Sequence, residues 1–267
     1  MGADPDTQGT SADRKQRPIE DKESYRWLQI QEQGPTGIHT LLIGDREADI
    51  YDLFIWPRAP HQHLLVRGAW DRKLENPSEQ HLWAVAEAAP VRGTTVVPVP
   101  PVPRKPGQPE REATLELRTT VVQVARPGHR RADTPAAPPL TVVLAREIDP
   151  PDGLAPIDWL LLTTLSAETV DDAARIVRWY SYRWRIERLH FTLKSGGSQV
   201  ERLQLETRER LERVITLYTI VAWRILWMTY QVRIDPDQSP TVAFSADEID
   251  ALGSWCITRV KNRALLC

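Results

Sequence analysis

Apolar residues recur at helical or strand spacing along most of the chain, but the first residues show no such pattern. Residues 1–16 are rich in Asp, Gly, Thr, Ser and Lys, which predicts a disordered segment. Between Tyr25 and Ile30 apolar side chains stand three residues apart, which indicates a short helix. Glycine and proline within residues 34–37 predict its end.

The next apolar runs predict two buried strands separated by a helix. Residues 38–44 are mostly apolar and short enough for a buried strand, and residues 64–66 form a second short run. Asp45 follows the first run directly and begins a helix-like stretch that reaches Phe54.

Residues 74–156 differ in character from the rest of the chain. Seven prolines between residues 90 and 109 interrupt this segment, and three β-rich runs surround them. The runs cover residues 94–97, 113–124 and 140–145. We interpret the segment as an inserted, mostly β subdomain.

Helices dominate the pattern after residue 156. A strand is predicted at residues 159–165, and residues 166–169 predict the start of a long helix that runs to Lys194. A further helix at residues 208–232 has apolar side chains at amphipathic spacing, and we expect it to be well packed. From about residue 254 the tail is poorly patterned.

Composition narrows the classes of function. The chain has 34 Lys and Arg against 36 Asp and Glu, so bulk positive charge cannot hold it to nucleic acid and any DNA contact must be local. Cys256 and Cys267 lack CxxC spacing, so neither a zinc site nor a disulfide framework is predicted. No apolar run approaches the roughly 20 residues that span a bilayer, so we expect a soluble cytoplasmic protein.

Four polar side chains share one face of the predicted long helix. On an ideal helix they fall within about 60° of arc: Tyr180, Arg183, Glu187 and Lys194. A carboxylate flanked by a phenol and two cations suits a metal ion and the phosphates of a phosphodiester. Taken alone, the helix favours a plainer interpretation, in which Arg183 and Glu187 form a solvated i,i+4 pair.

Asp45 changes this balance because it stands at the end of a predicted buried strand. Mixed sheets, including those of RNase H-like proteins, present ligand-binding residues at such strand ends. The alternative is that Asp45 caps the helix that follows it. The two roles are compatible, so both stay open.

Two segments resemble a known family. Residues 180–187, Tyr-Ser-Tyr-Arg-Trp-Arg-Ile-Glu, with Lys194 beyond them, are similar at every fixed spacing to a motif of insertion-sequence-four-type DDE transposases, especially the transposon-five type. Residues 45–50, Asp-Arg-Glu-Ala-Asp-Ile, resemble the family's second-aspartate segment. The resemblance covers about residues 17–255 and implies an α/β, RNase H-like (retroviral-integrase-like) catalytic core.

The resemblance also implies a role for each matching residue. Asp45 and Glu187 are expected to be two of three catalytic carboxylates that hold Mg²⁺, for which Mn²⁺ can substitute. Phosphate contacts near the cleaved DNA end are expected from the basic and phenolic matches, namely Tyr180, Arg183, Lys194 and Arg67. Trp159 matches a tryptophan on which a flipped base stacks; without the resemblance, a core tryptophan is the better expectation.

The same resemblance divides the chain into regions. Residues 17–73 are expected to be a partial RNase H-like core, which resumes at residues 157–200 after the β-rich insertion of residues 74–156. Residues 201–267 are expected to be a C-terminal helical region. The family's first catalytic aspartate has no counterpart in an apolar strand, so we expect a core incomplete at its N-terminus, truncation at both ends and impaired catalysis.

Three hypotheses follow for the function. The first is a nucleoid-associated DNA transposase that cuts and joins double-stranded DNA at transposon ends, with impaired activity. The second is a non-catalytic inhibitor that binds a DNA end, a second copy of this chain or a full-length transposase. Residues 173–214 support it, because they contain ten Lys or Arg against five acidic residues. The third is a fragment that does not fold stably because lost edge strands expose apolar surface.

Overall fold

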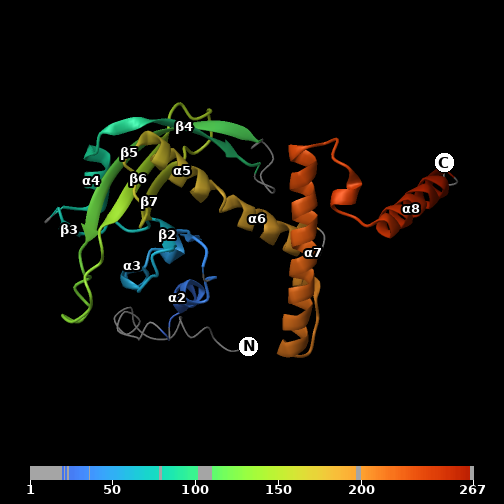
Figure 1. Cartoon of the computed structure of the whole chain (residues 1–267), viewed down its shortest axis with the longest axis horizontal. Helices are drawn as coiled ribbons and strands as arrows, with labels where there is room; N and C mark the ends of the chain where they lie inside the picture. Colours follow the sequence, from blue (N-terminus) through green and yellow to red (C-terminus); the bar gives the residue numbers. More distant parts are fainter. Residues whose placement is uncertain are drawn as a thin grey trace. The chain divides into compact units, whose positions relative to one another are not determined.

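The structure is a computed structural model that describes residues 20, 22, 24–35, 37–77, 80–101, 110–196 and 200–264 (Figure 1). The segment predicted to be disordered, residues 1–16, lies outside the described residues. The chain divides into two compact units, Met1–Trp184 and Arg185–Cys267. Among the described helices, none is long and apolar enough to cross a membrane.

Within the described residues, the first unit contains one seven-stranded mixed sheet in the order β1-β2-β7-β6-β5-β3, with β4 also paired to β5. β1 and β2 are parallel, and the other neighbours are antiparallel. The strands are β1 (Thr40–Gly44), β2 (Gln62–Arg67), β3 (Leu74–Asn76), β4 (Val91–Val99), β5 (Arg111–Val124), β6 (Leu140–Glu147) and β7 (Asp158–Thr163). The mixed α/β fold is therefore confirmed.

The segment predicted as an inserted subdomain, residues 74–156, contributes strands to this same sheet. β6 pairs directly with β7 and with β5, so the sheet runs without interruption from the predicted core into the predicted insertion. β3 and the helix α4 (Leu82–Ala88) were not expected. This shared sheet was not predicted, because the side-chain pattern of a strand shows which faces are buried and not which strand it pairs with. The insertion itself stays a prediction.

Alternate residues of the central strands face two hydrophobic cores, one on each side of the sheet. Val66 of β2 and Leu160 of β7 lie in the first core, which the helices on that side cover. Leu65 and Leu161 lie in the second core against α5, which crosses the sheet in Figure 1. This three-layer arrangement follows from the two-residue period of strand side chains. The covering helices are α2 (Tyr25–Glu32), α3 (Tyr51–Ile55) and α4 on the first side, and α5 (Val170–Ser181) on the second.

The long helix predicted to run from residue 166 to Lys194 is interrupted. α5 ends at Ser181, Tyr182 and Arg183 form a turn, and α6 (Trp184–Phe191) continues into a π-helical turn, η4 (Thr192–Gly196). The start predicted within residues 166–169 is confirmed, because Thr169 caps α5 in a capping box with Asp172. The single polar stripe drawn on an unbroken helix is therefore wrong, since polar spacing cannot detect a break in the backbone hydrogen bonds.

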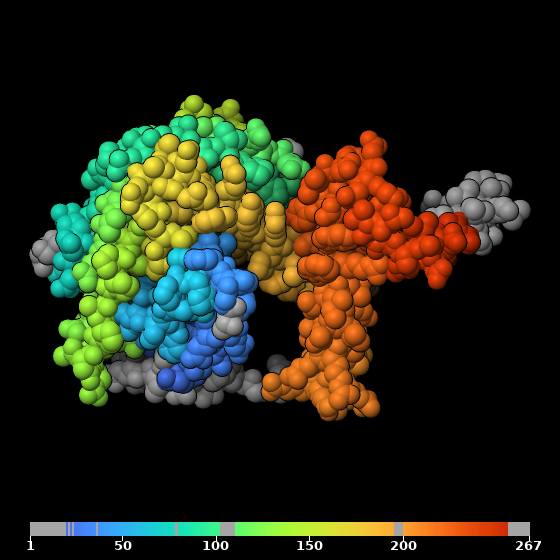
Figure 2. Space-filling view, in the orientation of Figure 1, coloured from blue at the N-terminus to red at the C-terminus, as the bar shows by residue number. Residues whose placement is uncertain are grey.

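Helices make up the second unit, and the longest of them exposes much of its apolar surface. Ala222 is the buried residue of α7 (Arg208–Ile234), and Leu217, Trp223 and Ile234 are more than half exposed. Figure 2 shows α7 in orange with its side chains at the surface. The expectation that this helix is well packed was wrong, because amphipathic spacing shows which side chains share a face and not whether anything covers them. The tail expected to be poorly patterned forms α8 (Ala246–Ala264).

A buried carboxylate ties the loop after β2 to the segment after β1. Asp49 Oδ2 accepts hydrogen bonds from the backbone N–H groups of Ala69 at 2.7 Å and Trp70 at 3.1 Å. Asp49 Oδ1 accepts from Arg72 Nε at 2.8 Å, and the Asp49 side chain is fully buried. Because these bonds join the two loops, they hold the ends of β1 and β2 together.

A close backbone approach requires glycine at the end of β1. A Cβ atom on Gly44 would lie 2.3 Å from the Cβ atom of Ala48. Ala48 is fully buried at the end of the short 3₁₀ turn η3 (Arg46–Ala48), which folds back onto the strand. The absence of a side chain at Gly44 therefore sets the path of the chain through Asp45.

We predict that Gly44→Ala lowers the free energy of unfolding by about 1–3 kcal/mol, because the added methyl group overpacks the turn against the strand. Urea unfolding followed by circular dichroism measures this change. Gly128→Ala is the matched control, since nothing lies within 4 Å of the added Cβ atom there. Equal stabilities of the two variants would contradict the packing argument.

We predict that Asp49→Asn lowers the free energy of unfolding by about 3–5 kcal/mol, because it leaves the largely buried Arg72 guanidinium without its counter-charge. Thermal unfolding in a calorimeter provides the measurement. Asp133→Asn removes a carboxylate from the exposed pair with Arg131, and we expect no change in its unfolding midpoint. A small effect at Asp49 would show that the clamp between the two loops is dispensable.

Candidate functional site

One edge of the sheet gathers most of the residues predicted to contact DNA or metal. Because β1 and β2 are parallel, with Gly44 paired to Val66, their carboxyl ends meet at this edge. Asp45 follows β1 and Arg67 ends β2. The antiparallel strand β7 begins here, and Arg67 Nη2 donates to the carbonyl oxygen of Asp158 at 2.9 Å.

Asp45 both caps a turn and faces a guanidinium. Its Oδ1 atom accepts a hydrogen bond from the backbone N–H of Glu47 at 3.0 Å, so the predicted capping role is confirmed, although the element capped is the 3₁₀ turn η3. Its Oδ2 atom lies 3.4 Å from Nη1 of Arg183. The Asp45 side chain is 33% exposed and that of Arg183 27%. The backbone thus anchors one carboxylate oxygen, while the other faces the Arg183 guanidinium.

Tyr180 lies between two arginines at this edge. Its side chain is buried, and its phenol oxygen accepts hydrogen bonds from the guanidiniums of Arg67 and Arg183. Burial raises the pKa of Tyr180, and the two arginines oppose that rise. Burial also lowers the pKa of Arg67, but a guanidinium stays charged at neutral pH. A connected network therefore runs from Asp45 through Arg183 and Tyr180 to Arg67.

Trp159 is part of an aromatic cluster beneath this network. It is 5% exposed, with its ring centroid 4.9 Å from that of Tyr180 and 5.3 Å from that of Trp184. This arrangement matches the alternative of a core tryptophan at a strand end. Stacking of a flipped base on Trp159 would require its aromatic neighbours to move, and it stays a prediction.

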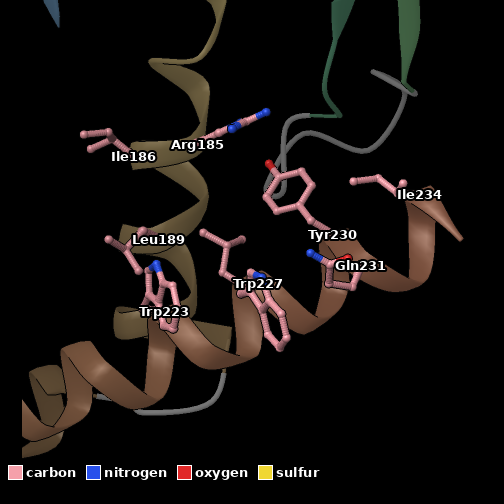
Figure 3. A pocket seen from close by; sticks show the side chains of 9 residues that line it. Arg185, Ile186, Leu189, Trp223, Trp227, Tyr230, Gln231 and Ile234 are labelled. Carbon is pink, nitrogen blue, oxygen red and sulfur yellow. The ribbon is translucent and has the colours of Figure 1, made fainter. Parts of the chain in front are cut away.

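Glu187 and Lys194 belong to the second unit, so their joint action with Asp45 stays a prediction. Glu187 is exposed on α6, and Lys194 Nζ lies 3.4 Å from Oε1 of Glu201. Figure 3 shows Ile186 and Leu189 of α6 in a groove that also contains side chains of α7. The groove is also lined by the polar side chains of Arg185 and Gln231, and the Glu187 carboxylate is not among the residues that line it.

Two residues at this edge have clear structural roles that the sequence did not predict. Asp49 holds the loops that follow β1 and β2, and Trp184 packs on Trp159. Both lie inside the quoted motifs, next to or near a residue that was singled out. Local sequence patterns cannot predict these contacts, because the partners are distant in the sequence. Only their position inside the two motifs points to these residues.

Asp45 has the chemistry of one ligand to a divalent cation, but the described residues do not gather a complete set. Its carboxylate offers hard oxygen donors, is partly exposed, and already stands beside a positive charge. Within the ranges that the structure describes, no group of three or more His, Cys, Asp or Glu side chains could hold a metal ion. The carboxylate of Asp45 thus suits one metal ligand, but the described side chains around it do not supply the others.

The sequence matches the model of one protein family. The family is described as Transposase DDE domain, and the match covers residues 25–224, which is more than half of the chain. It begins at the first residue of α2 and includes Asp45, the network at the sheet edge and Glu187. A DDE domain implies an RNase H-like core, a divalent metal ion and DNA at transposon ends as the substrate. The chain belongs to the DDE transposase family.

Proposed function

We propose that this protein acts at transposon ends through the sheet edge that carries Asp45. The observation that carries the proposal is the continuous network of Asp45, Arg183, Tyr180 and Arg67. A guanidinium beside a partly exposed carboxylate, with a second guanidinium connected through Tyr180, suits a phosphodiester, since arginine binds phosphate oxygens and a carboxylate binds the cation that phosphate chemistry needs.

Each residue has a distinct role in the proposed reaction. Asp45 and Glu187 hold the divalent cation, which when bound activates water and then a 3′-hydroxyl group for in-line attack on phosphorus. Arg67 and Arg183 bind the phosphates on either side of the cleaved bond, and Lys194 binds a phosphate further along the strand. Tyr180 holds the guanidiniums of the two arginines through its hydroxyl group. The arginines then position the DNA end without reading its sequence.

We assign the chain to the insertion-sequence-four type within the family, with cut-and-paste transposition as its reaction. The support is the spacing of Tyr180, Arg183, Glu187 and Lys194 in the sequence. The break between α5 and α6 falls inside this motif, next to Arg183. Mg²⁺ is the proposed cation, because oxygen donors and phosphates suit it, and Mn²⁺ can replace it.

A second candidate function is that of a non-catalytic inhibitor that binds DNA ends or a transposase. The specific observation in its favour is that two guanidiniums, those of Arg67 and Arg183, share the Tyr180 hydroxyl group. The network of Arg67 and Arg183 would bind phosphate without any metal. The two functions differ in whether the DNA is cleaved.

Cleavage of a labelled duplex that carries the terminal repeat separates the two functions. We expect the protein to cleave it with Mg²⁺ or Mn²⁺ at the impaired rate that the sequence predicts. Asp45→Asn and Glu187→Gln should each lower that rate at least about 100-fold, because even the outer partners of metal ligands contribute about 10–100-fold. Asp133→Asn, an exposed carboxylate elsewhere, is the control and should cleave normally. Retardation of the duplex in metal-free gels without any cleavage would favour the inhibitor instead.

Arg183 should contribute about one phosphate contact. We predict that Arg183→Ala weakens DNA binding and reduces the slope of log affinity against log salt by about 1. Fluorescence anisotropy at several salt concentrations measures the slope, and Arg131→Ala, an exposed arginine, serves as the control. An unchanged slope would assign Arg183 to its ion pair with Asp45 alone.

A further inference from the structure

A cavity of about 400 Å³ lies in the first unit, outside the polar network described above. Three parts of the chain form most of its wall: the segment after β2, with Trp70 and Arg72; the start of α3, with Tyr51 and Asp52; and the loop between β5 and β6, with Arg130. Its volume is within the range of pockets that bind small molecules. The proposed reaction uses none of its side chains.

Hydrogen bonds hold the wall of this cavity in place. The Tyr51 hydroxyl group donates to the carbonyl oxygen of Pro135 at 2.9 Å and accepts from the backbone N–H of Ala137 at 3.1 Å. The Arg130 guanidinium pairs with the Asp52 carboxylate. Both contacts tie the loop between β5 and β6 to α3, so the cavity does not depend on a ligand for its shape.

Trp70 presents its ring to solvent from a fixed backbone. Its side chain lines the cavity, yet the residue is 64% exposed. Its backbone N–H donates to the buried Asp49 carboxylate, which also binds Arg72 two residues later. A large ring that is anchored in this way but left uncovered suits stacking by a planar ligand, such as a nucleic-acid base.

The charge of the wall favours an anionic ligand. Three cationic side chains line the cavity against two carboxylates, namely Lys22, Arg72 and Arg130 against Asp49 and Asp52. Each carboxylate already pairs with one of the arginines. A guanidinium has five N–H donors, so the pair with Asp52 does not use all those of Arg130. A ring for stacking and a cation for a phosphate together suit a nucleotide.

We propose that this cavity binds an unpaired nucleotide of a DNA strand, with the base stacked on Trp70 and its phosphate at Arg130. Stacking accepts every base, because each has a π-face, so the site does not read sequence. It differs from the predicted base contact of Trp159, which is buried in the aromatic cluster. The proposal needs no metal ion and no role for Asp45, only DNA as the ligand, which membership of the DDE transposase family implies.

DNA binding by the full chain in metal-free buffer tests the stacking. Fluorescence anisotropy compares two labelled duplexes of the same sequence, one blunt and one with a short single-stranded thymidine extension. We expect the unchanged protein to bind the extended duplex more tightly. Trp70→Ala should weaken binding of the extended duplex about five- to 150-fold, which is the scale of one base stacked on an aromatic side chain, and leave the blunt duplex unaffected.

Trp223→Ala is the matched control for Trp70→Ala. Trp223 is 58% exposed but belongs to the second unit, so it is not part of this cavity. Its removal should leave the preference for the extended duplex intact. An equal loss in both variants would overturn the site, because it would show a general effect of exposed tryptophan. A Trp70→Ala variant that keeps the preference, or an unchanged protein that has none, would overturn it too.

Arg130→Gln tests the phosphate contact, with Arg131→Gln as the neighbouring control. The Arg131 side chain is 87% exposed and does not line the cavity. For the extended duplex, Arg130→Gln should reduce the slope of log affinity against log salt by about 0.7, the value for one phosphate of a single strand, while Arg131→Gln leaves it unchanged. Equal slopes in the two variants would overturn the contact. If Arg130→Gln does not unfold cooperatively, Trp70→Ala decides, since its ring is exposed.

Arg183→Ala distinguishes failure of this site from failure of the proposed function. If it weakens binding of both duplexes but keeps the preference, the sheet edge and the cavity are both supported. If it changes neither affinity while Trp70→Ala loses the preference, the cavity stands and the sheet edge falls. A labelled polyglutamate peptide covers the other chemistry. Peptide binding that is lost in Trp70→Ala, with DNA binding unchanged in that variant, would assign the cavity to an acidic protein segment and overturn the nucleotide.

Discussion

Parallel pairing of β1 with β2 is the constraint on which the candidate site depends. It brings the carboxyl ends of two strands to one edge of the sheet, so that Asp45 and Arg67 lie beside each other although the chain between them forms a turn, a helix and a loop. Packing of both strands against a core on either side keeps this register, although most of β1 is only half-buried. The loops that leave the two strands are then joined by the buried Asp49 carboxylate.

The polar network at this edge is supported by an apolar one. Tyr180 belongs to both, since its ring packs edge-on against Trp159 while its hydroxyl group accepts hydrogen bonds from two arginines. Because the Tyr180 ring is buried and packed, its hydroxyl group gives the two guanidiniums a fixed hydrogen-bond partner. The aromatic cluster thereby supports the tyrosine that links Arg67 to Arg183, and Arg183 in turn faces Asp45.

The sequence predicted the parts of the fold that local patterns determine. β1, β2 and β7 are short apolar runs, and Asp45 was placed correctly at a strand end because it directly follows one of them. The pairing of β6 with β7 was missed, since hydrogen bonding between distant strands leaves no mark on either run. The break after Ser181 was missed because polar spacing from Tyr180 to Lys194 also suits an unbroken helix. Asp49 and Asp45 look alike in the sequence, and only the N–H groups of a later loop distinguish their roles.

The central claim is that the sheet edge at Asp45 binds the divalent cation. Anomalous diffraction at the manganese edge, from crystals of the protein grown with a DNA duplex and Mn²⁺, tests it most directly. The account predicts an anomalous peak bonded to a carboxylate oxygen of Asp45, with Arg183 turned towards a phosphate. A peak at other carboxylates, with Asp45 still paired to Arg183, would contradict it.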